Sequence, residues 1–149
     1  MESVQHFRKT DLARRTRQVL DAVQNGHTVI IETEGEPQVV MVDVIDYSIL
    51  RAVMHYYTRH PSVDADAGLS DEAVGACAVP QARYNLVLAY YLEGAISLAR
   101  AAELLDLSQP DLRARCVRLD VPLRAAPADL EEAGRDVETA RAWSDPSVL

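Results

Sequence analysis

Residues 28–42 read TVIIETEGEPQVVMV, and this stretch decides the fold of the N-terminal half of the chain. Two apolar runs, residues 29–31 and 39–42, flank the turn-forming sequence Glu34-Gly35-Glu36-Pro37, which predicts a β-hairpin. Neither run alternates apolar with polar residues, so we expect each strand to be covered on both faces. A unit this short buries little surface alone, which makes a second copy of the chain a natural source of the missing cover.

A helix is predicted before the hairpin. We expect it to start at a cap provided by Thr10 or Asp11 and to end at Asn25-Gly26, where glycine adopts the left-handed conformation at little cost. The residues expected to face the core fall within one arc when successive residues advance by about 100°. These residues are Leu12, Thr16, Val19, Leu20 and Val23.

A second helix is predicted after the hairpin, with Asp43 as its N-cap. Its apolar residues recur at helical spacing: Val44, Ile45, Tyr47, Leu50, Val53, Met54 and Tyr57. Such a pattern is typical of a helix that buries one face. We therefore expect its apolar stripe to lie across the hairpin.

Positive charge is concentrated around the first helix. Residues 6–17 hold five Lys or Arg side chains and one acid, a local charge of +4. The planar fork of donors on an arginine fits the oxygens of a phosphate group. Phosphate binding is therefore one interpretation of this cluster, and a solvated helix face that binds nothing is the other.

Residues 3–57 resemble the N-terminal domain of the Phd/YefM family of antitoxins. The resemblance depends on Phe7-Arg8, Leu20, Val23, Asn25-Gly26, Val29-Ile30-Ile31, Gly35-Glu36-Pro37, Val39-Val40-Met41-Val42 and Tyr47. It implies a domain that forms a homodimer and binds its own promoter, while a separate C-terminal segment neutralises a toxin. It also implies that operator contacts come from the basic N-terminal region: His6, Arg8, Lys9, Arg14, Arg15 and Arg17.

Composition points to a binding protein inside the cell. The chain has 149 residues, a net charge of −8 and 48% hydrophobic residues. It contains no apolar stretch near the roughly 20 residues of a membrane span and no signal-peptide core at its N-terminus, so we expect a cytoplasmic protein without membrane contact. In that compartment Cys77 and Cys116 are expected to be reduced, with a disulfide as the alternative.

Signals of catalysis are missing from the sequence. It has no Cys/His pair, no glycine-rich phosphate loop and no metal-ligand spacing, so we expect neither an enzyme nor a cofactor or metal site. Asp64, Asp66 and Gly68 match only part of a calcium loop. His55 and His60 fit a helix end, where cations are favoured without a metal.

The C-terminal half is predicted to be helical. We divide the chain into a dimerisation and DNA-binding domain (1–60), a linker (61–80), a helix-turn-helix domain (81–126) and an acidic tail (127–149). Residues 82–92 predict a central core helix, and Ser97 and Ser108 are expected to cap the two helices that follow. Asp106 stands where the turn between these helices usually has glycine.

This second half resembles the helix-turn-helix of many bacterial regulators, and also a family of small proteins often encoded beside PIN-domain toxins. The matching residues are Tyr91-Leu92-Glu93-Gly94, Ser97-Leu98 and Ala101-Ala102-Glu103-Leu104. If its second helix enters a major groove, the candidates for DNA contact are Gln109, Arg113, Arg115 and Arg118. A protein-binding helical bundle is the alternative, because the fold alone does not choose between them.

The tail is the predicted toxin-binding segment. Residues 129–145 hold six acids and two arginines, a charge of −4 that suits a basic partner surface. The candidate contacts are Asp129, Glu131, Glu132, Asp136, Glu138 and Trp143. Trp143 either anchors in a partner groove or packs on its own domain.

Together these features predict an α+β fold, with a Phd/YefM-like hairpin and two helices followed by an all-α helix-turn-helix domain. The expected function is that of a dimeric type II antitoxin, which neutralises a protein toxin, expected to be a PIN-domain ribonuclease, and represses its own operon. A stand-alone dimeric transcription regulator with no toxin partner is the alternative. A structural adaptor that only dimerises is the third possibility.

Overall fold

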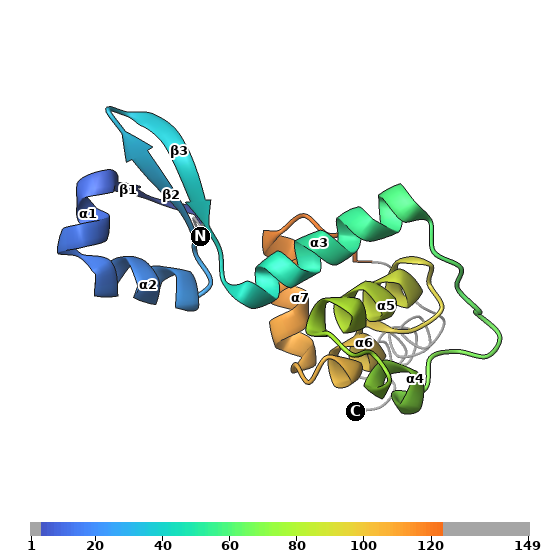
Figure 1. Ribbon diagram of the computed structural model, residues 1–149. Helices are drawn as coiled ribbons and strands as arrows, with labels where there is room; N and C mark the ends of the chain where they lie inside the picture. Colours follow the sequence, from blue (N-terminus) through green and yellow to red (C-terminus); the bar gives the residue numbers. More distant parts are fainter. Residues whose placement is uncertain (1–3, 124–149) are drawn as a thin grey trace, which may run out of the picture. The chain divides into compact units, whose positions relative to one another are not determined.

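The computed structural model describes residues 4–123, and within them the protein is α+β, with a three-stranded sheet and seven helices (Figure 1). The chain divides into two compact units, Met1–Leu50 and Arg51–Leu149. Helix α3 (Val44–Arg59) crosses this boundary. The boundary thus lies ten residues before the one predicted at residue 60.

The N-terminal unit is built on a small mixed sheet. Strands β2 (Thr28–Thr33) and β3 (Glu36–Met41) pair antiparallel, which confirms the predicted hairpin. Strand β1 (Val4–Arg8), which the sequence did not reveal, pairs parallel to β2, so the strand order is β1-β2-β3. Between β1 and β2 lie α1 (Lys9–Arg14) and α2 (Thr16–Gln24).

The hairpin turn explains the position of Gly35. Glu34 and Gly35 both have positive φ, 54° and 80°, and Thr33 pairs with Glu36 across the strands. Two central residues with positive φ are the signature of a type I′ turn, whose twist matches that of the two strands. Glycine meets this requirement without steric cost at the second position.

One face of the sheet carries the core of this unit. The buried residues come from β1, α2 and β2: Phe7, Val19, Ala22, Val23, Val29 and Ile31. In β3, by contrast, Val39 is 52% exposed and Val40 is 61% exposed. The expectation that both strands are covered on both faces is therefore wrong for the single chain, because a single helical layer covers only one side of the sheet.

The first helix differs from its prediction. It is broken at Arg15, whose φ of −126° and ψ of 37° are not helical, so α1 and α2 are separate helices. Neither Thr10 nor Asp11 is the N-cap: Asp11 lies in the first turn and its carboxylate accepts a hydrogen bond (2.9 Å) from the backbone N–H of Arg8. The predicted end at Gly26 is confirmed, with φ at 91°.

Helix α3 begins as predicted but buries a different face. The Asp43 carboxylate accepts a hydrogen bond of 2.7 Å from the backbone N–H of Asp46, which confirms the N-cap. Ile49 and Ala52 are fully buried. The exposed apolar residues form a stripe, hereafter the α3 stripe: Val44, Tyr47, Leu50, Met54 and Tyr57. The expectation that this stripe packs on the hairpin is wrong, because the helix has two apolar faces and buries the one with Ile49.

The C-terminal unit is helical over its described length. Helix α5 (Pro80–Leu92) has six consecutive buried residues at its C-terminal end, which confirms a core helix. It contacts α4 (Asp71–Gly75) and α6 (Leu98–Leu104), and α6 in turn contacts α7 (Gln109–Arg118). The Tyr91 hydroxyl, on α5, donates a hydrogen bond (3.1 Å) to the carbonyl of Pro122 and ties down the segment after α7.

The caps of α6 and α7 are confirmed. The hydroxyl oxygen of Ser97 accepts a hydrogen bond from the Arg100 backbone N–H (3.0 Å), and that of Ser108 accepts one from the Asp111 N–H (3.2 Å). Between the helices Asp106 is left-handed, with φ at 55°. The next residue, Leu107, donates its N–H to the Ala102 carbonyl (2.9 Å), which closes α6 in a Schellman motif.

The predicted linker, residues 61–80, contains folded structure. Helix α4 lies within it, capped by Ser70, and Leu69 and Val74 are buried. The expectation of a plain linker is therefore wrong for its second half, because two apolar side chains in this segment join the core. Cys116 is buried, Cys77 is half-buried, and both are free thiols.

Candidate nucleic-acid interface

The predicted basic cluster is assembled by three consecutive elements. Arg8 ends β1, Lys9 and Arg14 are the first and last residues of α1, Arg15 occupies the break, and Arg17 lies in the first turn of α2 (Figure 1). All five side chains belong to exposed residues. The break at Arg15 changes the direction of the helix, so the five cations do not follow one straight helical face.

Most of these cations carry uncompensated charge. Within residues 4–123, Arg8, Lys9, Arg14 and Arg17 form no ion pair. Arg15 alone has a partner, the Asp11 carboxylate at 4.0 Å, while its own side chain is 59% exposed. An ion pair with so long a distance and so exposed an arginine contributes little to stability, and another anion can easily replace Asp11 as the partner of Arg15. The cluster can therefore bind the oxygens of a polyanion with little loss of free energy from broken internal ion pairs.

His6 is less available than the sequence implied. Its Nδ1 lies 2.5 Å from the Glu32 carboxylate, on the neighbouring strand β2. The two side chains share a sheet face, since His6 is in register with Ile30, two residues from Glu32. This pairing gives His6 an internal partner that competes with any phosphate.

The candidate residues of α7 have different surroundings. Arg113 is exposed, whereas Gln109 and Arg118 are half-buried. The Arg115 side chain is only 12% exposed, and its Nε donates to the Asp111 carboxylate (3.1 Å), one turn earlier in the same helix. Of this set, Arg113 presents the most accessible charge on α7.

The six candidates for toxin binding, residues 129–143, lie outside the described residues, so the structure neither places them nor relates them to any surface.

One residue with a clear role was not singled out in the sequence. Arg100, on α6, donates from Nη2 to the Leu69 carbonyl (3.1 Å) and to the Asp71 carboxylate (2.8 Å), and its Nη1 lies 3.2 Å from Glu103. Partial burial lowers the pKa of Arg100, but hydrogen bonds to Glu103 and Asp71 raise it, so the pKa stands above its ordinary value. Arg100 thus joins α6 to the start of α4. An arginine on a helix surface gives no sequence signal of such a role.

Neither a metal-ligating cluster nor a membrane-spanning helix occurs in the part of the chain that the structure describes. In residues 4–123 no group of three His, Cys, Asp or Glu side chains is placed to hold a metal ion. None of the helices in the same range has both the length and the apolar character needed to cross a membrane. Comparisons with protein-family models, with curated proteins and with solved structures found no match for this chain.

Proposed function

We propose that the chain is a dimeric DNA-binding antitoxin, which represses its own operon through the N-terminal unit and neutralises a protein toxin through the C-terminal part. The observation that carries the proposal is the exposed basic cluster from Arg8 to Arg17, in which four of five cations have no ion pair with any residue between 4 and 123. Neutralising phosphates with such side chains supplies affinity that does not depend on base sequence. The Phd/YefM-like order of elements in residues 3–57 agrees with this function.

Dimerisation is supported by apolar surface that the single chain leaves uncovered. Tyr47, Leu50, Met54 and Tyr57 recur at intervals of three and four residues along α3, and each is more than a third exposed. This is the spacing with which two helices interlock along a shared seam. Val39 and Val40, on the edge strand β3, add further exposed apolar surface. A second copy of the chain would cover these residues and present two basic clusters to a palindromic operator.

The toxin-binding part of the proposal rests on charge and resemblance. The tail has a charge of −4 over residues 129–145, which suits the basic groove of a nuclease such as a PIN-domain ribonuclease. Copurification of the full chain with the product of a neighbouring toxin-like gene tests this part. A variant in which the five candidate acids are replaced by Asn or Gln, and Trp143 by Ala, is expected to copurify without the toxin-like protein.

The DNA-binding part is tested by fluorescence anisotropy with the full chain and its own upstream promoter fragment. Each phosphate contact contributes about 0.9 to the slope of log affinity against log salt. Arg14→Ala with Arg17→Ala removes up to four contacts in a dimer, so we expect the slope to fall by up to about 3.6. Arg113→Ala is the matched control, because it removes another exposed arginine, on α7. Loss of binding in the control alone would make α7 the DNA reader.

The second candidate function, a stand-alone transcription regulator, is favoured by one observation: α6 and α7 pack together through a short turn and leave Arg113 exposed. In that case both units bind DNA, and no toxin-like partner copurifies. A third class, an adaptor that only dimerises, predicts no promoter binding by any of these variants.

A further inference from the structure

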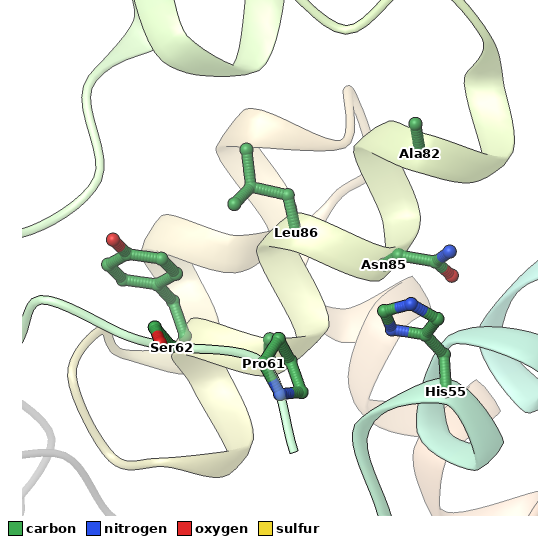
Figure 2. A pocket seen from close by; sticks show the side chains of 8 residues that line it. His55, Pro61, Ser62, Ala82, Asn85 and Leu86 are labelled. Carbon is green, nitrogen blue, oxygen red and sulfur yellow. The ribbon is translucent and has the colours of Figure 1, made fainter. Parts of the chain in front are cut away.

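Charge distinguishes the pocket around His55 from the basic cluster. This pocket of the C-terminal unit lies where α3, the segment after α3 and α5 meet (Figure 2). Its eight lining residues include no Asp, Glu, Lys or Arg, and Ala82, Leu86 and Ala89 contribute apolar surface. A phosphate group would lose hydration there without meeting a cation, which is unfavourable. A polyanion is therefore expected at the cluster Arg8–Arg17 and not at this pocket.

Asp11 is the one acid within this cluster. No other acidic residue occurs in residues 6–17. Its side chain is only 14% exposed, whereas that of Arg15 beside it is 59% exposed. A carboxylate near a phosphate-binding surface repels the phosphate, so charge alone disfavours an acid at this position. The contacts of the carboxylate give the reason for its presence.

The first of these contacts holds the junction between β1 and α1. Asp11 Oδ2 accepts a hydrogen bond (2.9 Å) from the backbone N–H of Arg8, the last residue of β1 and the N-cap of α1. Helix α1 has six residues and none of them is buried, so local hydrogen bonds matter more for its position than in a helix with a buried face. Without the carboxylate, the backbone at Arg8 would lose the bond that fixes it to α1.

Further contacts lie at the other end of α1. The backbone carbonyl of Asp11 accepts a hydrogen bond (2.7 Å) from the N–H of Arg15, which occupies the break before α2. Asp11 Oδ1 lies 4.0 Å from Arg15 Nε. This weak ion pair can be exchanged for a phosphate, but in the free chain it limits the orientations of the Arg15 side chain. Asp11 therefore contacts two of the five cations, one at each end of α1.

We propose that Asp11 is a positioning residue of the DNA-binding surface, whose carboxylate fixes the spacing of Arg8 and Arg15 so that both can contact operator phosphates at once. This inference rests on the proposed DNA binding by the N-terminal unit. A side chain that is ordered before binding loses less conformational entropy when it contacts a phosphate. Phosphate contacts set the register of a protein on the duplex, so cations at a fixed spacing contribute more than the same charges on a loose segment.

The test compares Asp11→Ala with Asp11→Asn in the full chain, by fluorescence anisotropy with the promoter fragment over a range of salt concentrations. Both variants lose one negative charge, but asparagine keeps an oxygen that can accept the Arg8 N–H. Charge alone predicts tighter binding for both. Positioning predicts that Asp11→Ala raises the dissociation constant about three- to tenfold, while Asp11→Asn binds at least as tightly as the native chain.

The matched control is Asp21→Ala, on α2. It removes an exposed acid and so changes the net charge of the chain by the same amount as Asp11→Ala. Asp21 lies outside residues 6–17, and we expect its replacement to leave promoter binding as tight as in the native chain or slightly tighter. Weaker binding by Asp11→Ala than by Asp21→Ala therefore reports the lost contacts and not the lost charge.

The salt dependence separates positioning from stability. If Arg8 and Arg15 no longer contact phosphates in either protomer of a dimer, the slope of log affinity against log salt falls by up to about 3.6. Lower stability alone reduces the folded fraction and leaves the contacts of the folded chain unchanged. Each protein is therefore also measured in trimethylamine N-oxide, which stabilises the folded state without replacing the carboxylate.

Three results would overturn the proposal. Binding by Asp11→Ala as tight as that by Asp21→Ala, or weaker binding with an unchanged salt slope, would exclude the positioning role and leave the proposed function intact. A difference that disappears in trimethylamine N-oxide would make Asp11 a stabilising residue only. Absence of promoter binding by the native chain would overturn both the positioning role and the proposed function.

Discussion

Replacing Arg100 with methionine tests whether residues 61–80 are held to the C-terminal unit. Methionine keeps an apolar stem of similar length but removes every donor of the guanidinium group. The lost interactions are the hydrogen bond to the Leu69 carbonyl and the ion pairs with Asp71 and Glu103. The Arg100 side chain is only 30% exposed, whereas Asp71 is 77% exposed, so the backbone hydrogen bond is the larger contribution.

These contacts set the expected size of the effect. A hydrogen bond to a backbone carbonyl contributes about 1 kcal/mol, and a pair of exposed ion pairs adds about 0.5–1 kcal/mol. The free energy of unfolding should therefore fall by about 1.5–2 kcal/mol. With a urea dependence of about 2 kcal/mol per molar, the midpoint of unfolding moves down by somewhat less than 1 M.

The assay is urea unfolding of the full chain followed by far-UV circular dichroism, combined with hydrogen exchange at residues 70–76. Faster exchange there shows that the opening is local to α4. Glu103→Gln is the control, because it removes only the pair within α6 and should cost less than about 0.5 kcal/mol. Equal effects of Arg100→Met and Glu103→Gln, without faster exchange in α4, would refute the reasoning.

Three further predictions concern stability and assembly. Ile31→Ala, at a residue 2% exposed in the sheet core, should lower the free energy of unfolding by about 3 kcal/mol in urea unfolding; a loss under 1 kcal/mol would contradict the core assignment. Ser108→Ala removes the cap of α7 and should cost about 1 kcal/mol by the same measurement, and no loss would mean that water replaces the cap. Met54→Lys with Tyr57→Lys should shift sedimentation equilibrium towards monomer with an unchanged circular dichroism spectrum, and an unchanged dimer would exclude the α3 stripe from the interface.

Local signals predicted the elements that depend on a few neighbouring residues. The hairpin turn requires positive φ at its two central residues, and the sequence Glu34-Gly35 predicts such a turn. The caps at Asp43, Ser97 and Ser108 each satisfy an N–H group three residues away, so a short window of sequence suffices to find them.

Elements that depend on distant partners could not be found in this way. Strand β1 is stabilised by parallel pairing with β2, about twenty residues later, and its own sequence has no alternating pattern. The start of α4 is joined to α6 by Arg100, which donates to Leu69 and Asp71 from about thirty residues away. The exposed stripe on α3 was assigned to the wrong contact because periodicity shows that a face is apolar but does not tell what covers it.

The same distinction between local signals and distant contacts applies to the candidate sites. The basic cluster could be located from charge alone, and its side chains are exposed as a binding surface requires. The ion pair of Arg115 with Asp111 could also be predicted from the sequence, since residues four apart on a helix are neighbours. The pocket around His55 could not, because it joins three segments that only the tertiary structure brings together.

The ends of the helices indicate how far this chain is from its greatest attainable stability. Helices α2 and α5 are followed by a left-handed glycine, but Asp106 and Asp120 take the equivalent positions after α6 and α7, with φ of 55° and 56°. An L-residue in this conformation costs about 1 kcal/mol more than glycine. Asp120→Gly is thus expected to stabilise the fold, whereas Asp106→Gly also removes the ion pair of Asp106 with Arg83 (3.1 Å), which offsets part of the gain; such unused gains are expected when selection maintains only enough stability for function.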